Sequence, residues 1–507
     1  MIFVAVDEFE FILRKSVDET QCDAVAIGLF EENLQRNELE SANALSEEKL
    51  SKLVEKKEFA AKEGEVLTFY TSGKQQKFFA IGLGKESAFS TENARKLGAI
   101  VSKAARKAKV KKLAFSMLDL KLNLISFEDF TRSFCEGALL SQYKYSKYKA
   151  QKPEEEDAKL SQIALIFESP EKIERSAFKG KILAQMQNAA RDLDNSPGND
   201  LTPIKFSEIA NELSKKYNLN MTVFEKAEIE RMGMNGLIAV NKGSDLPPKL
   251  LVLRYFGKDI SPASTALALV GKGVTFDAGG ISLKPSDGME RMKGDKAGAV
   301  AVLMALCAAS ALKLKINVIG VLPITENMPD GKATRPGDIV TMYNKKTVEI
   351  QNTDAEGRLI LADALAYTQT LKPSAIIDIA TLTGACSVAL GAEAIAIMAN
   401  NSELVQTFRE AGLDSFERVW ELPMWKEYDD YIKSDVADMK NIGRKGQAGT
   451  IAGAVFLRHF VGDFPWVHLD IASVDWSDDD RYYKTKGSDG AGVRLLTYFL
   501  EKMESKQ

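Results

Sequence analysis

Four carboxylates of this chain lie where predicted strands and helices begin or end, in positions that suit the binding of metal. Asp277 follows a predicted strand at residues 266–270, and Asp295 immediately precedes an alanine-rich predicted helix. Asp354 and Glu356 stand two residues apart, between another predicted strand and an apolar helical stretch. Charges at the ends of buried strands are costly unless they are paired or bind a metal ion. The four acids are therefore candidates for one site.

Each acid also has an ordinary structural interpretation. Asp295 could be a helix N-cap, and Asp277 a turn residue before two glycines. Asp354 and Glu356 fit an Asx-turn and the first turn of a helix, but in an extended segment they would point to one face. Four carboxylates in one pocket would repel, and two divalent cations would balance their charge. Two such metals can activate a shared water, and oxygen ligands alone do not choose between Mg, Mn and Zn.

Two lysines and an arginine lie in the same segments. Lys272 stands between two glycines and could ligate a metal only as the neutral amine, which requires burial or a nearby cation. Lys284 and Arg358 would stay cationic and face negative charge that develops on a substrate oxygen. The structural alternative for all three is ion pairing with the carboxylates.

Histidine and cysteine are too scarce to supply a conventional zinc site. The chain of 507 residues has two histidines, His459 and His468, and 4 cysteines, all scattered. This excludes an HExxH zinc helix and a CxxC knuckle, and it suits a reducing compartment. His468 lies in a predicted buried strand, where we expect it to pack behind the site. His459 follows a predicted helix, and we expect it to be structural or to lie at a subunit contact.

The overall composition is that of an ordinary globular protein. Hydrophobic residues make up 45% and charged residues 27%, and the net charge of -4 does not recruit nucleic acid or an anionic membrane. The N-terminal sequence MIFVAVDEFEF has acids where a signal peptide has a basic start. The longest weakly polar stretch, residues 297–312, is shorter than the ~20 residues of a membrane span. We expect a cytoplasmic protein with neither a membrane nor a nucleic acid as partner.

The pattern of strands and helices predicts an α/β protein of two domains. Short apolar strands alternate with helices in a small N-terminal α/β domain at residues 1–170, for which we expect a role in assembly or regulation. A helical pattern at 171–195 predicts a linker helix. Residues 196–507 form the predicted catalytic domain, whose apolar strands, including one at 347–351, indicate a mostly parallel central sheet covered on both faces. Ligands of such sheets bind beyond the carboxyl ends of the strands, where the candidate acids lie.

Several separated motifs resemble the leucyl aminopeptidases, also called cytosol aminopeptidases. The strongest match is NTDAEGRL at residues 352–359, the signature octapeptide of that family. Further matches, in the family's order and spacing, are NSPGNDLTP at 195–203, GKGVTFDAGGISLK at 271–284, MKGD at 292–295, TLTGA at 381–385, GQAGT at 446–450 and HLDIA at 468–472. The N-terminal third matches only in its length and α/β pattern. The resemblance implies a metal-dependent exopeptidase that removes leucine and other apolar residues from the N-terminus of peptides.

The resemblance also implies a ligand set of two metal ions. One ion would be held by Lys272, Asp277, Asp295 and Glu356, and the other by Asp277, Asp354 and Glu356, so that Asp277 and Glu356 bridge. We expect zinc or manganese, with magnesium and cobalt as alternatives.

The same resemblance implies roles for the catalytic cations and the pocket. Lys284 would polarise the scissile carbonyl and stabilise the oxyanion. Arg358 would hold a bicarbonate-like anion that acts as general base toward the bridging water. The pocket for the first side chain would be lined by Met292, Thr381, Gly384 and Ala472. The family's assembly is a homohexamer, a dimer of trimers, that acts on peptides with a free N-terminus.

Three positions depart from the family's pattern. Ala278 stands where serine is common, Ser473 where glycine is usual, and Lys296 where methionine usually follows the metal aspartate. A cation at Lys296 would weaken the neighbouring metal site or point to solvent. Every implied ligand and both catalytic cations are present.

Two other functions compete with this interpretation. A different dinuclear-metal hydrolase, such as a phosphoesterase, would predict histidine ligands, and no histidine lies near the acidic motifs. The other alternative is a non-catalytic DNA-binding or scaffolding hexamer. It would be favoured by a basic surface, and the negative net charge argues weakly against one.

Overall fold

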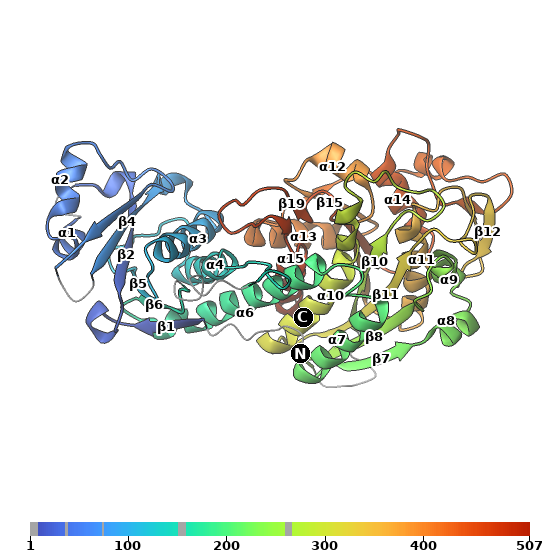
Figure 1. Cartoon of the computed structure of the whole chain (residues 1–507), viewed down its shortest axis with the longest axis horizontal. Coiled ribbons are helices and arrows are strands. Elements are labelled where there is room, and N and C mark those ends of the chain that lie inside the picture. The colour runs from blue at the N-terminus through green and yellow to red at the C-terminus, as the bar shows by residue number, and fades with distance from the viewer. Residues whose placement is uncertain (1–8, 36–38, 73–75, 151–158, 259–265, 507) are drawn as a thin grey trace. The chain divides into compact units, whose positions relative to one another are not determined.

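The structure is a computed structural model that divides into two compact units. It describes residues 9–35, 39–72, 76–150, 159–258 and 266–506 (Figure 1). The smaller unit lies within residues 4–188 and includes residues 479–485, and the larger one is formed by residues from 189 to 478 and from 486 on. The first eight residues, on which the expectation of no signal peptide rests, lie outside the described part.

The smaller unit is a six-stranded sheet between two layers of helices. Its strands are β1 (Glu10–Arg14), β2 (Ala24–Phe30), β3 (Val66–Tyr70), β4 (Lys77–Gly84), β5 (Lys112–Ser116) and β6 (Gln162–Ile166). They follow the order β1-β6-β5-β2-β4-β3, and the described pairs are parallel except β3 with β4. Side chains alternate across β2. Ala24 and Ala26 pack in the core beneath α3 (Thr91–Lys107) and α4 (Phe127–Leu140). Val25 and Ile27 face the core beneath α1 (Glu40–Ser46) and α2 (Lys49–Glu55).

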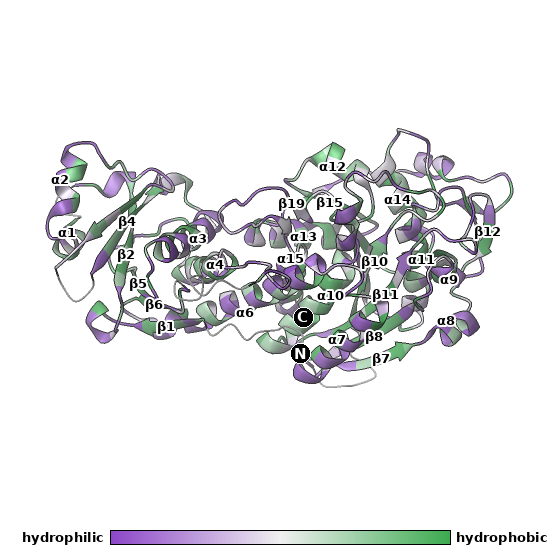
Figure 2. Cartoon of the chain, in the orientation of Figure 1, coloured by the Kyte–Doolittle hydropathy of each residue, from purple (hydrophilic) through white to green (hydrophobic). Residues whose placement is uncertain are grey.

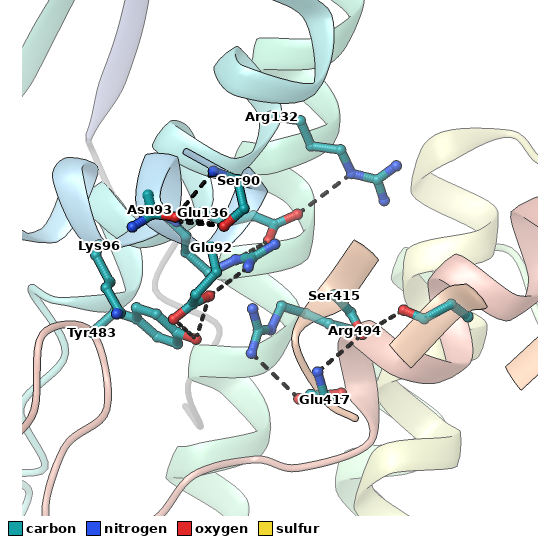
Figure 3. A network of polar contacts seen from close by, with 12 residues as sticks. Ser90, Glu92, Asn93, Lys96, Arg132, Glu136, Ser415, Glu417, Tyr483 and Arg494 are labelled. Atoms are coloured by element: carbon teal, nitrogen blue, oxygen red, sulfur yellow. Dashed lines mark hydrogen bonds and ion pairs between the residues drawn. The ribbon is translucent and has the colours of Figure 1, made fainter. Parts of the chain in front are cut away.

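A segment from late in the chain completes the core of this smaller unit. Arg95 is fully buried in α3, where its guanidinium lies 2.8 Å from Glu92 and 2.8 Å from Glu136. Tyr483 is also buried, and its hydroxyl donates to the Glu92 carboxylate at 3.1 Å (Figure 3). Arg132 approaches Glu136 from the other side at 3.4 Å. Residues 479–485 are thus part of the N-terminal unit by their packing.

A long helix, α6 (Pro170–Asn195), is present where the sequence predicts one at 171–195. The division between the two units falls within it.

The larger unit is built on a nine-stranded sheet. Its strands are β7 (Asn220–Phe224), β8 (Lys249–Phe256), β9 (Leu267–Gly271), β10 (Gly273–Asp277), β11 (Asn317–Asn327), β14 (Ala375–Ala380), β15 (Ile395–Ala399), β16 (Val419–Glu421) and β18 (Trp466–Asp470). The order is β16-β15-β18-β14-β9-β11-β8-β7, and β10 pairs with β11. Antiparallel pairing is confined to three of the described pairs, β15–β18, β8–β11 and β7–β8. The prediction of a mostly parallel central sheet is confirmed.

Helices cover both faces of this sheet. Gly271 and Gly320 approach α10 (Ala297–Leu312), which packs with α15 (Val493–Ser505) on one face. Val270 and Val321 belong to the core on the other face, with residues of α9 (Asn235–Asn241), α11 (Glu356–Gln369) and α14 (Gly449–Arg458). The unit also contains α7 (Pro203–Lys216), α8 (Lys226–Met232), α12 (Gly384–Leu390) and α13 (Ser402–Ser415). Both predicted helices that flank the acids, 298–312 and 358–370, are therefore core helices.

The most apolar helix is an interior one. The helical stretch Met289–Leu312 is long and apolar enough to cross a membrane, but 89% of its most apolar window is buried inside the protein. Figure 2 shows α10 in the colours of hydrophobic residues beside the strands of the sheet. This stretch is accordingly a core helix of the fold.

Two local predictions about the sheet are wrong. The strand predicted at 347–351 is β13 (Thr347–Ile350), which pairs with β12 (Asp338–Thr341) and β17 (Met439–Lys440) in a separate three-stranded sheet. Because β13 forms a hairpin with β12, its main-chain groups pair there, and β13 does not join the central sheet. Asp277 does not directly follow the strand predicted at 266–270, since β10 begins two residues after the end of β9 and pairs with β11.

Candidate functional site

The candidate acids come from three segments of the larger unit that meet beyond the central strands. Asp277 is the last residue of β10, and Asp295 lies between a short 3-10 helix, η5 (Met289–Gly294), and α10. Glu356 is the first residue of α11. The parallel strands β9, β10 and β11 bring the first two segments to the same edge of the sheet. This is where open α/β sheets bind their ligands.

The structure brings all four predicted acids and Lys272 together. Carboxylate oxygens of Asp277, Asp354 and Glu356 lie within 4.8 Å of one another. The Nζ atom of Lys272 lies 2.6 Å from Asp295 Oδ1 and 2.9 Å from Glu356 Oε1, and so joins Asp295 to the group. The reason given for pairing Asp354 with Glu356 is wrong, however. They do not share an extended segment, because Asp354 lies in a turn and Glu356 in a helix.

A glycine allows this arrangement. A Cβ atom on Gly357 would lie 2.6 Å from Cε of Lys272, so any larger residue would displace the lysine. Lys272 therefore crosses the first turn of α11 where that helix has no side chain.

The cluster is strongly acidic and only partly neutralised. Burial raises the pKa of Asp277 and of Asp295, and the negative charge of Glu356 raises both further. Burial alone would lower the pKa of Lys272, but Asp295 and Glu356 raise it more. The two lysines of the site compensate two of the four carboxylate charges. The remaining negative charge can be balanced by bound protons or by further cations.

Lys284 reaches the same acids from the solvent side. Its Nζ atom lies 2.8 Å from Asp277 Oδ2 and 2.5 Å from Asp354 Oδ1, and its side chain is 20% exposed. Burial lowers the pKa of Lys284, but Asp277 outweighs this effect and the pKa is raised. The side chain is therefore a cation that borders both the carboxylates and the solvent.

Arg358 is a buried cation with unused hydrogen-bond donors. Within the described residues its Nε and Nη1 atoms are buried and have no hydrogen-bond partner. Burial lowers its pKa to about 10, against the raising effects of Glu356 and Asp470. It is cationic at neutral pH, and buried donors of this kind indicate that an anion or water binds them.

Two asparagines position the acids and were not found by the sequence analysis. Asn327, at the end of β11, donates from Nδ2 to Asp277 Oδ1 at 2.8 Å and to the carbonyl oxygen of Thr353 at 3.0 Å. Asn441 donates to the carbonyl oxygen of Asn352 at 2.6 Å and accepts from the main-chain N–H of Gln351 at 2.9 Å. Asn327 was detectable, since it is polar and ends a strand as Asp277 does. Asn441 lies in a loop and carries no local signal.

The threonine of the octapeptide joins the two acidic segments directly. Its hydroxyl donates to the carbonyl oxygen of Gly279 at 2.6 Å and accepts from the N–H of Ser282 at 2.8 Å. The main-chain N–H of Thr353 in turn donates to the Ser282 hydroxyl at 3.2 Å. The loop after β10 and the turn before α11 are thereby held as one body.

One of the four predicted pocket residues, Thr381, contacts Asp295. Thr381 follows β14, and its hydroxyl donates to Asp295 Oδ1 at 2.8 Å. Ala472 follows the neighbouring strand β18, and Gly384 begins α12, where a Cβ would meet only open space. Met292 is half-buried in η5, and its contact with the other three rests on the resemblance alone.

The two histidines have structural surroundings, as expected. His468 is buried in β18, with Nδ1 2.5 Å from Asp378 Oδ1. His459 follows α14, and its Nε2 atom lies 3.1 Å from Asp429 Oδ1. Neither contacts the candidate acids. Lys296 does not point to solvent, since it is completely buried.

The donor set fits divalent cations. Asp295 Oδ2 and Glu356 Oε2 are buried and without a hydrogen-bond partner among the described residues. Such oxygens are costly unless a cation binds them. The amine and carboxylate ligands suit Zn²⁺ and Mn²⁺.

Comparison with known proteins agrees with this geometry. A model of the cytosol aminopeptidase family's catalytic domain matches residues 188–497, and a model of that family's N-terminal domain matches residues 26–152. A "probable cytosol aminopeptidase" of Geobacter sp. is 43% identical over 94% of this chain and 96% of its own length. One from Alkaliphilus metalliredigens is 40% identical over 97% of this chain and 99% of its own length.

Solved structures show the same similarity. A bottromycin maturation enzyme, BotP, in complex with Mn has a TM-score of 0.84 and 32% identity, over 95% of this chain and 99% of its own. A mutant of tomato leucine aminopeptidase has a TM-score of 0.86 and 30% identity, over 97% of this chain and 96% of its own. The chain belongs to the cytosol aminopeptidase family and is a metal-dependent aminopeptidase.

Proposed function

We propose that the acidic cluster holds two divalent metal ions, zinc or manganese, for the hydrolysis of N-terminal peptide bonds. One set of ligands is Lys272, Asp277, Asp295 and Glu356, and the other is Asp277, Asp354 and Glu356. The observation that carries this proposal is the group of carboxylate oxygens of Asp277, Asp354 and Glu356 within 4.8 Å of one another, to which Lys272 joins Asp295. Such ions, when bound, lower the pKa of a coordinated water so that it can act as a nucleophile near neutral pH.

Lys284 acts on the substrate carbonyl in this proposal. Its ammonium already lies at the solvent edge of the cluster, and it stays protonated because Asp277 raises its pKa. A cation placed there polarises the scissile carbonyl and stabilises the negative charge that develops on its oxygen.

Arg358 supplies the site of the general base. Its buried Nε and Nη1 donors would hold a small oxyanion such as bicarbonate, which when bound would supply the general base. His468 does not fit this role, since it is fully buried and paired with Asp378.

The substrate is a peptide with a free N-terminus. Its α-amine binds beside the carboxylates, and an apolar first side chain such as leucine occupies a pocket formed by Met292, Thr381, Gly384 and Ala472. The hydroxyl of Thr381 links this pocket to the cluster through Asp295.

The assembly is a homohexamer in the cytoplasm. Residues 1–170 serve as an assembly domain, residues 171–195 as a linker helix, and residues 196–507 as the catalytic domain. The support is the N-terminal family match and the names of the relatives.

The decisive experiment measures release of leucine from a dipeptide with a free amine and from its N-acetylated form. We expect cleavage of the free form alone, loss of activity on chelation, and recovery with Mn²⁺ or Zn²⁺. Asp277→Asn should abolish metal binding, whereas the surface variant Asp338→Asn should not. Equal cleavage of the acetylated peptide, or a rate that chelation leaves unchanged, would overturn the proposal.

A further inference from the structure

Lys296 is a fully buried lysine at the beginning of α10, one residue after Asp295. Its ammonium donates to the main-chain carbonyl oxygens of Asp194 at 3.3 Å and Ser196 at 3.1 Å, and to that of Lys293. A lysine ammonium has three donors, so all of them are used by carbonyl oxygens. These oxygens come from two segments, the end of α6 and η5.

Two buried acids lie near the same ammonium. Asp194 and Asp475 are both almost fully buried, and Lys296 interacts electrostatically with each. The Ser488 hydroxyl lies 3.2 Å from Asp194 Oδ2 and 3.3 Å from Asp475 Oδ1, which links the two acids. Nearby, Arg191 forms an ion pair with Asp489 at 2.8 Å.

Carbonyl oxygens that surround a cation, with carboxylates behind them, replace the hydration shell of a monovalent ion. An ammonium without partners is costly to bury, and the charge of Lys296 opposes the rise that burial causes in the pKa of Asp194 and of Asp475. We infer that the ammonium of Lys296 takes the place of a bound monovalent cation. The site that it occupies is formed by the carbonyl oxygens of residues 194, 196 and 293, with Asp194 and Asp475 nearby. Lys296 thereby holds the turn that carries Asp295 against the end of α6.

The cation site stands independently of the proposed metal ligands. Only the expected effect of Lys296 on metal affinity rests on the proposed role of Asp295 as a ligand. Stability in different salts and metal affinity are therefore measured separately.

The test is Lys296→Met, which retains most of the side-chain volume and removes the charge. Thermal midpoints are measured in choline, potassium and ammonium chloride at equal ionic strength. We expect a lower midpoint in choline, with saturable and selective recovery in potassium and ammonium, ions of similar size to the lost group. The parent protein should show no such selectivity. If the variant folds only in potassium, the refolding yield replaces the midpoint with the same expected order.

A matched control separates this from the loss of any buried lysine. Lys249 is also buried, but it pairs with the exposed Glu225 and has no carbonyl cage. Lys249→Met should lose stability without selective recovery. Adding Asp475→Asn to Lys296→Met should reduce both the loss and the recovery, because one of the two buried acids beside the site is removed.

Three results would overturn the inference: equal midpoints for parent and Lys296→Met, equal recovery in choline and potassium, or no folding in any of these salts. Mn²⁺ affinity is then measured by competition with a chelator. We expect it to fall by about 10–100-fold in choline and to recover in potassium, as for loss of a group that orients a ligand. If Lys296→Met recovers stability selectively but its Mn²⁺ affinity is unchanged, the cation site is supported and Asp295 is rejected as a metal ligand.

Discussion

The side-chain amide of Asn327 donates to Asp277 Oδ1 at 2.8 Å, and the same nitrogen donates to the carbonyl oxygen of Thr353 at 3.0 Å. One atom at the end of β11 therefore fixes both acidic segments. Asp277 Oδ1 also accepts from the main-chain N–H of Gly279 at 2.9 Å, so Oδ2 is the oxygen that faces Lys284. The orientation of Asp277 thus depends on Asn327.

Asn327→Ala should weaken metal binding by about 10–100-fold, since partners that orient ligands contribute at this level. Mn²⁺ affinity by chelator competition is the measurement, and activity at saturating metal should recover in part. The matched control is Asn241→Ala, which removes another buried asparagine, one that donates to Leu246 and Thr325. Equal effects of both variants on Mn²⁺ affinity would reduce Asn327 to a general structural residue.

Lys284→Ala should lower kcat by about 10²–10³-fold while the metals remain bound, as for the loss of one group that stabilises an oxyanion. Because the ammonium pairs with Asp277 and Asp354, its removal should leave metal affinity equal or higher. Steady-state kinetics together with measured metal content decide the matter. Metal loss in this variant would contradict the assigned role.

Arg358→Ala should lower kcat by about 10²–10⁴-fold, the usual contribution of a positioned general base. The parent enzyme should slow in buffer freed of carbonate and regain its rate with added bicarbonate, because the buried Nε and Nη1 donors hold the anion. Arg358→Lys keeps the positive charge but loses the planar set of guanidinium donors, so added bicarbonate should raise the rate of this variant only weakly. An identical bicarbonate response in all three proteins would exclude Arg358 as the anion site.

Much of the fold could be predicted from local patterns. The strand predicted at 266–270 is β9, within one residue at each end, and the alanine-rich helix predicted after Asp295 is α10. Both elements are buried, and their apolar residue pattern reflects the apolar core that they contact. The strand at 347–351 was assigned to the wrong sheet, because its partners β12 and β17 are short and only half-buried. Apolar pattern alone cannot distinguish a small peripheral sheet from a central one.

The acids of the site could also be predicted, but not the groups that hold them. Asp277 and Glu356 were detectable because charge at the end of a buried element requires compensation. Asn441 and Thr353 act through hydrogen bonds to segments about 70–90 residues away, and such contacts leave no local pattern. The burial of Lys296 could not be predicted either. Its hydrogen-bond partners are main-chain carbonyl oxygens, which every residue has and which therefore leave no signal in the sequence.

Asp363 provides a pH-dependent contribution to stability that is separate from the acidic cluster. This carboxylate is fully buried in α11 and accepts from the N–H of Leu237 at 3.0 Å and of Tyr343 at 2.8 Å. Burial raises its pKa to about 7, although these N–H groups lower it. Between the unfolded value of about 4 and pH 7, the folded state keeps a proton that the unfolded state has released. The free energy of unfolding contributed by this group therefore falls as the pH rises through that window.

Asp363→Asn should make that decline shallower by up to roughly 1.4 kcal/mol per pH unit between about pH 4 and 7. Urea unfolding of parent and variant across this range is the measurement. Asp338→Asn is the control, because the N–H of Arg335 holds the pKa of Asp338 below its usual value and outside the window. If Asp363→Asn and the parent decline with the same slope, the carboxylate is ionised in the folded protein throughout this range. Its two N–H partners would then outweigh the effect of its burial.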